Sequence, residues 1–163
     1  MGLTGSLPNS IGNFHSITSF DISSNSLTGT IPNTLDTWYY TIDNMEMQNN
    51  LFTGSIPSTL GALTKLTTLL LYSNSLTGTI PRQMSTMKAL SVLKLQNNFL
   101  TMGKLQFVPV GTFSATTANS TSFDISNNCF DYVNNLQPAT TTFSKNCRPT
   151  GQPTGRKYRH SLV

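Results

Sequence analysis

The segment LTGTIPNTL at residues 27–35 returns as FTGSIPSTL at 52–60 and as LTGTIPRQM at 76–84, and a first copy, LTGSLPNSI, stands at 3–11. Self-similarity at a fixed period of roughly 20–50 residues predicts a solenoid, in which each repeat buries its apolar face against its neighbours. The repeated segment therefore decides the architecture before any secondary structure is assigned.

An asparagine precedes each full copy at a nearly constant interval. The members of this asparagine ladder are Asn25, Asn50, Asn74, Asn98 and Asn128, which follow one another after 25, 24, 24 and 30 residues. Counted from these asparagines, apolar residues recur at −5, −3 and +2 in all five repeats, at −8 in four and at +6 in three. The alternation at −5 and −3 predicts a short strand, with positions −4 and −2 on its opposite face. The asparagine amide is expected to bond backbone groups at the turn that follows.

The spacing L-x-x-L-x-L-x-x-N-x-L, with its added Leu-Thr-Gly-x-Ile-Pro segment, resembles the plant-type leucine-rich repeat of receptor-like kinase ectodomains and polygalacturonase-inhibiting proteins. The resemblance covers roughly residues 1–130. It implies an α/β repeat solenoid, the leucine-rich repeat horseshoe, with short parallel strands on the concave face and 3₁₀ or extended segments on the convex face. Glycine at position +4 allows a tight turn, and proline at +7 fixes an extended backbone on the outer side.

Three regions follow from this pattern. Residues 1–130 form the solenoid, with a partial first repeat and an irregular last one, because the spacing widens before Asn128 and the Ile-Pro is lost. Residues 131–147 form a C-terminal cap, and 148–163 a flexible Pro/Thr/Gly and basic tail. Nothing precedes Leu3, Leu7, Ile11 and Phe14 to cover the first coil, so we expect the chain to be a fragment of a longer protein.

Two features of the C-terminal part concern covalent chemistry. Cys129 and Cys147 resemble the cysteines in the C-terminal caps of secreted leucine-rich repeat proteins, which implies a disulfide closing the cap. The alternative is two free thiols in an intracellular protein, and an even count confined to one cap favours the bond. Asn119 begins an Asn-Ser-Thr sequon and is the candidate glycosylation site.

Composition and missing motifs exclude several function classes. Half of the ten Lys and Arg residues lie in the last nineteen positions, so the nearly neutral body argues against nucleic-acid binding. No apolar run is long enough for membrane insertion by this chain, and an anchor would belong to the full-length protein. We find no metal-ligand spacing, phosphate loop or nucleophile elbow, so we expect no cofactor, no metal and no enzyme. A kinase domain is absent from this chain and would also belong to the full-length protein.

Positions −4 and −2 define a candidate ligand-binding face. The −4 column reads Asp21, Glu46, Leu70, Lys94 and Asp124, and the −2 column reads Ser23, Gln48, Tyr72, Gln96 and Ser126. Leu70 and Tyr72 form an expected apolar centre, with Asp21 and Glu46 on one side and Lys94 on the other, as in a small binding hot spot. The alternative is that Leu70 and Tyr72 only cover the strand beneath glycans or neighbouring domains.

The carboxylates of Asp21 and Glu46 are similar to the pair of catalytic carboxylates in a glycosidase, because adjacent strands hold them close together. On an open concave face water keeps both ionised, so we favour binding over catalysis. We expect a non-catalytic module, extracellular or at the cell surface, that binds a protein, peptide or glycan and belongs to a leucine-rich repeat receptor-like protein. The alternatives are a secreted inhibitor of a cell-wall hydrolase and a structural wall protein on a Pro/Thr-rich stalk.

Overall fold

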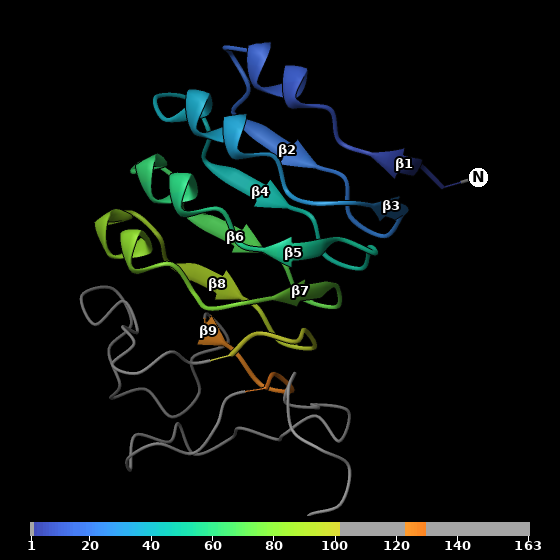
Figure 1. The fold of residues 1–163 in the computed structure, drawn as a ribbon. Helices are drawn as coiled ribbons and strands as arrows, with labels where there is room; N and C mark the ends of the chain where they lie inside the picture. The colour runs from blue at the N-terminus through green and yellow to red at the C-terminus, as the bar shows by residue number, and fades with distance from the viewer. Residues whose placement is uncertain (1, 102–122, 130–163) are drawn as a thin grey trace, which may run out of the picture.

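A computed structural model describes residues 2–101 and 123–129, where each repeat forms one coil of a solenoid (Figure 1). One short strand from each coil joins a five-stranded parallel sheet in the order β2-β4-β6-β8-β9, called the inner sheet below. Its strands are β2 (Ser19–Asp21), β4 (Asn44–Glu46), β6 (Thr68–Leu70), β8 (Val92–Lys94) and β9 (Phe123–Asp124). The predicted solenoid with parallel strands is confirmed.

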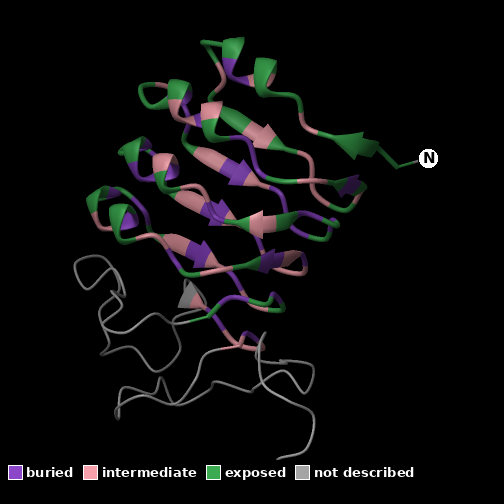
Figure 2. Cartoon of the chain, viewed as in Figure 1, coloured by how far each residue is buried: buried purple, intermediate pink, exposed green. Residues whose placement is uncertain are grey.

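The middle residues of β4, β6 and β8 point into the core, as the two-residue alternation predicts. Met45, Leu69 and Leu93 are fully buried, whereas the residues on either side of them are only half-buried. Figure 2 shows the buried residues gathered between the inner sheet and the segments that return along the outer side. The core therefore runs along the solenoid, and each coil buries its apolar face against its neighbours.

The outer side of every complete coil carries a 3₁₀ helix, which agrees with the predicted convex segments. These helices are η1 (Asn9–Asn13), η2 (Asn33–Trp38), η3 (Ser58–Ala62) and η4 (Arg82–Thr86). Each begins directly after a proline, because the ring fixes the φ that the chain needs there; for Pro57 φ is −63°. Consecutive helices pack closely, since a Cβ added at Gly61 would overlap the Gln83 carbonyl oxygen of the next coil.

A second set of short strands follows the asparagine ladder, and the repeat pattern did not predict it. These strands are β1 (Thr4–Ser6), β3 (Ser26–Thr28), β5 (Thr53–Ser55) and β7 (Ser75–Thr77). They form two parallel pairs, β1-β3 and β5-β7. The glycine of β5, Gly54, has a φ of +74°, a conformation that only glycine adopts readily.

The asparagine ladder ties successive coils together. The Asn74 side-chain nitrogen donates to the carbonyl oxygens of Leu71 and Met47, both at 3.1 Å. Its side-chain oxygen accepts from the Phe52 amide at 3.0 Å. The other ladder members accept from the equivalent upstream amides, namely Leu3 to Asn25, Leu27 to Asn50, Leu76 to Asn98 and Leu100 to Asn128. The residue before each asparagine has a positive φ, which turns the chain inward.

The first coil is open at its free face, as expected from the sequence: Leu3 is 57% exposed and Phe14 is 62% exposed. The last described strand rejoins the sheet in register, with Leu93 opposite Phe123. The irregular stretch before it, the cap at 131–147 and the tail at 148–163 lie outside the described residues, as do Asn119 and Cys147. The Cys129–Cys147 disulfide and the glycosylation of Asn119 therefore stay predictions. Within 2–101 and 123–129, no helix has the length and apolarity to span a bilayer.

Candidate binding face on the inner sheet

The −4 column forms a continuous row across the inner sheet. Backbone pairing places Asp21 beside Glu46, Glu46 beside Leu70, Leu70 beside Lys94 and Lys94 beside Asp124. These residues lie on the face opposite the buried Met45, Leu69 and Leu93, so their side chains share the solvent side of the sheet. The strands that carry them are about 4.8 Å apart. The row thus runs from two acidic residues through an apolar one to a cation and a further acid.

The −2 column continues on the same face where the strands end. Backbone hydrogen bonds keep the coils in step here, because the Asn49 amide donates to the Tyr72 carbonyl at 3.1 Å and the Ser73 amide to the Gln96 carbonyl at 3.0 Å. The resulting order across the coils is Ser23, Gln48, Tyr72, Gln96 and Ser126. Tyr72 thus has a glutamine on each side.

The expected apolar centre lies flush with the sheet and does not project from it. Leu70 and Tyr72 are both half-buried, as is Lys94 beside Leu70. Side chains in adjacent coils are only one strand spacing apart, so each covers part of its neighbour. A ligand would meet Leu70 and Tyr72 as part of a continuous surface with the polar residues around them.

Glu46 and Gln48 form a fixed polar cluster next to this centre. The two carboxylate oxygens of Glu46 accept hydrogen bonds from the side-chain nitrogens of Asn44 at 2.8 Å and Gln48 at 3.2 Å. Gln48 belongs to the candidate binding face by its −2 position, yet it is only 6% exposed. Its amide is packed among neighbouring coils, and its role is to hold the Glu46 carboxylate.

Two glutamine oxygens on this face lack a hydrogen-bond partner. The side-chain oxygens of Gln48 and Gln96 are buried and accept no hydrogen bond in the described part of the chain. Buried polar atoms in folded proteins are nearly always paired, so such atoms mark places where a structure has unused bonding capacity. These two atoms belong to the residues on either side of Tyr72.

The carboxylates at both ends of the row are bound to their own backbone. Asp21 accepts from the Ser23 amide at 2.9 Å, and Asp124 accepts from the Ser126 amide at the same distance. The bond from the Ser23 amide lowers the pKa of the Asp21 carboxyl below its usual 3.8. An acid catalyst of a glycosidase pair needs a raised pKa, so the geometry favours a structural role for Asp21 in the turn after β2.

The sequence reasoning missed an exposed aromatic pair directly after η2. Tyr39 and Tyr40 follow η2, are 41% and 66% exposed, and have ring centroids 3.7 Å apart. The signal in the sequence is one extra residue in this repeat, where η2 is six residues long and η3 is five. In the described segments no group of three or more His, Cys, Asp or Glu residues is arranged to hold a metal ion.

Comparison with known proteins supports the repeat assignment. The family model described as Leucine Rich Repeat matches residues 16–38 and 65–87. No curated protein sequence matches the chain significantly. Among solved structures, the BIR2 ectodomain from Arabidopsis thaliana is 31% identical, with a TM-score of 0.64; the match covers 78% of this chain and 63% of that one.

Two structures of complexes are also similar to this chain. The plant peptide hormone receptor RGFR1 in complex with RGF2 is 31% identical with a TM-score of 0.68, over 79% of this chain and 20% of that one. The complex of BIR3 with SERK2 from Arabidopsis thaliana gives 30% identity and a TM-score of 0.63, over 79% of this chain and 65% of that one. The chain therefore spans less than two thirds of BIR2 and about a fifth of RGFR1.

Proposed function

Because the chain is a leucine-rich repeat protein of the plant type, we propose that its inner sheet recognises a protein or peptide ligand and that Tyr72 is the centre of the contact. The similar structures support this class of partner, since RGFR1 was solved with RGF2 and BIR3 with SERK2. The similar BIR2 structure is of an ectodomain, which supports an extracellular or cell-surface location and a place within a receptor-like protein. The recognition is non-catalytic.

The observation that carries the proposal is the pair of unpartnered glutamine oxygens on either side of Tyr72. An extended peptide offers a backbone N–H at every residue except proline, and the side-chain oxygens of Gln48 and Gln96 are acceptors that no described residue uses. The Tyr72 ring between them supplies apolar area and a hydroxyl, a combination that is enriched in binding hot spots. Acceptors next to an aromatic ring therefore suit a polypeptide chain laid across the strands.

The charged residues near Tyr72 favour one orientation of the bound ligand. Glu46 lies on one side of Leu70, and Lys94 lies on the other. A ligand with a basic group toward β4 and an acidic group toward β8 would have both charges matched, which improves specificity and the rate of association more than affinity. We expect bound sequences to carry charges in this order, with an apolar residue between them.

Selection of a random linear peptide library on the folded protein tests this function. Enriched peptides would be titrated into isotope-labelled protein, and the backbone amides that shift would be mapped by NMR. We expect the largest shifts in β4, β6 and β8 and at Tyr72, and few in η2, η3 and η4. Shifts that cluster on the 3₁₀ helices, or a library that yields no enriched peptide, would contradict the proposal.

A further inference from the structure

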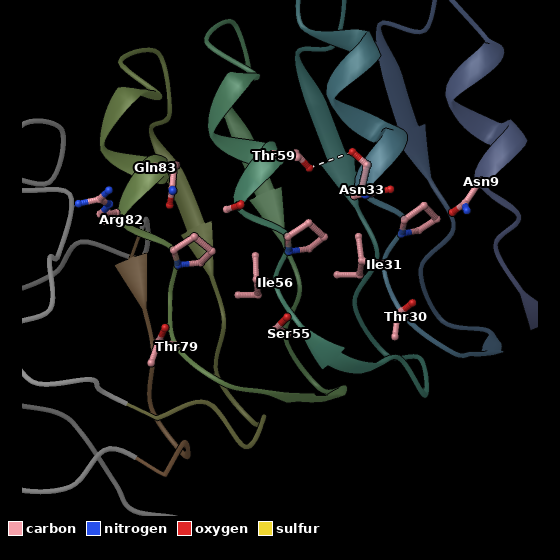
Figure 3. Close-up of a pocket in the computed structure, with 14 residues that line it drawn as sticks. Asn9, Thr30, Ile31, Asn33, Ser55, Ile56, Thr59, Thr79, Arg82 and Gln83 are labelled. Carbon is pink, nitrogen blue, oxygen red and sulfur yellow. Dashed lines mark hydrogen bonds between the residues drawn. The ribbon is translucent and has the colours of Figure 1, made fainter.

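An open groove crosses the outer side of the solenoid, away from the inner sheet. It encloses about 820 Å³ and is lined by equivalent residues of successive coils. Figure 3 shows Thr30, Ser55 and Thr79 along one side, and Asn33, Thr59 and Gln83 along the other, with Ile31 and Ile56 between them. The Ser/Thr, Ile and Pro positions thus recur along the groove, whereas the residue after each proline changes from Asn33 to Ser58 to Arg82.

The floor of the groove is apolar. Pro32, Pro57 and Pro81 line it, one from each coil; Pro57 and Pro81 are half-buried, whereas Pro32 is buried, as are Ile31 and Ile56. The prolines immediately precede the 3₁₀ helices, so their rings are held by a backbone of fixed φ. A rigid row of small saturated rings offers a ligand apolar contact at little entropic cost.

The rims are polar and nearly uncharged. Among the described residues, the hydroxyls of Thr30, Ser55 and Thr79 have no hydrogen-bond partner, which leaves them free to donate and accept. The Thr59 hydroxyl is already used, because it donates to the Asn33 carbonyl at 2.9 Å. Of the described residues that line the groove, only Arg82 is charged. This combination fits a neutral ligand that is rich in hydroxyl groups and has apolar C–H faces.

The spacing of the coils separates two kinds of linear ligand. The strands β5 and β7, which precede Pro57 and Pro81, are paired, so these two coils are about 4.8 Å apart where the strands pair. An extended peptide repeats its side chains on one face after about 6.6 Å, twice its rise per residue, and falls out of step with the coils. An extended chain of β-linked pyranose rings advances by one ring over nearly the coil spacing, so two successive rings can face Pro57 and Pro81.

We propose that the outer groove binds a linear, neutral oligosaccharide of β-linked pyranose rings. Two successive rings lay their C–H faces on the half-buried Pro57 and Pro81, and the chain directs its hydroxyls to the Thr30, Ser55 and Thr79 rim and to the amide of Gln83. This site is separate from the peptide-binding face of the inner sheet, and the two can be occupied independently.

Titration calorimetry with cellohexaose tests the groove. Pro57→Ala removes part of the apolar floor and should raise the Kd about fivefold, the scale of two partly buried methylene groups. Pro8→Ala is the matched control, because Pro8 precedes η1 in the same way and does not line the groove. We expect this control to leave the Kd unchanged, and maltohexaose, which has the same sugar in a coiled chain, to bind more weakly.

Several results would overturn the proposal. One is the absence of any cellohexaose binding, and another is an equal loss of cellohexaose affinity in Pro57→Ala and Pro8→Ala. A third is that the protein binds only tetragalacturonate and that Arg82→Gln abolishes this binding. Loss of cellohexaose binding in Tyr72→Ala, with Pro57→Ala unaffected, would place the sugar on the inner sheet and would also overturn it. Peptide selection on the inner sheet is a separate experiment, so failure of one proposal does not decide the other.

Discussion

The side-chain oxygen of Asn74 accepts a hydrogen bond from the backbone amide of Phe52, twenty-two residues earlier in the chain, at 3.0 Å. The same side chain donates to carbonyls of its own coil and of the preceding one, and it is only 8% exposed. One short amide thus satisfies backbone groups from two coils where the chain turns out of the inner sheet. This relationship repeats at every ladder asparagine and fixes the stacking of the coils.

Asn74→Ala is expected to lower the free energy of unfolding by about 1–3 kcal/mol, because it leaves buried backbone groups without partners. Chemical denaturation followed by circular dichroism measures the change. Asn33→Ala is the control, since Asn33 is exposed and its side chain makes no hydrogen bond among the described residues. An unchanged midpoint for Asn74→Ala would contradict the ladder's structural role.

Gly61→Ala is expected to destabilise the protein by about 1–3 kcal/mol, the usual cost of forcing extra volume into a tightly packed site. The added methyl would overlap the Gln83 carbonyl, which is backbone and cannot rotate away. Ala62→Gly serves as a comparison, because it changes the neighbouring exposed position of η3 without adding volume. If thermal melts show Gly61→Ala to be as stable as the wild type, η3 and η4 do not pack as described.

Asp21 should contribute stability that depends on pH. Its folded-state pKa is lowered by the Ser23 amide, so the contribution is present above the ordinary value of 3.8 and is lost as pH falls through the folded-state pKa. We expect the wild type to be more stable than Asp21→Asn near neutral pH and the difference to vanish in acid. Urea midpoints measured across this range test the sign, with Asp43→Asn as a control whose carboxylate accepts no bond from a described residue. A difference that grows toward low pH would refute the assignment.

Much of the fold could be predicted because the period of the sequence equals one coil of the structure. Once the ladder asparagines are aligned, the register of Glu46, Leu70 and Lys94 on neighbouring strands follows directly, and the backbone pairing agrees. The positions of the 3₁₀ helices also follow, since each proline marks where one begins. These features depend on spacing alone.

The exposure of the same side chains could not be predicted from spacing. Gln48 belongs to the outward column, yet it is buried because neighbouring coils lie so close that a long side chain is covered by those beside it. Asp21 is in the outward column too, but it bonds the amide two residues ahead. The column of a residue predicts which face of the sheet it lies on, but not the hydrogen bonds that its side chain makes. The accessible part of the binding face could therefore be identified only from the structure.

The role of the inner sheet is tested most directly by comparing the Kd of a selected peptide for the Tyr72→Ala and Tyr40→Ala variants. Tyr40 is the matched control, because it is an exposed tyrosine outside the two columns. For a peptide selected on the wild type, we expect Tyr72→Ala to raise the Kd at least about tenfold, as truncation of a hot-spot residue does. Tyr72→Phe would keep most of the affinity, and melting curves would confirm that both variants are folded. If the Tyr72→Ala variant is folded and binds as tightly as the wild type, while Tyr40→Ala loses binding, recognition does not occur at the inner sheet.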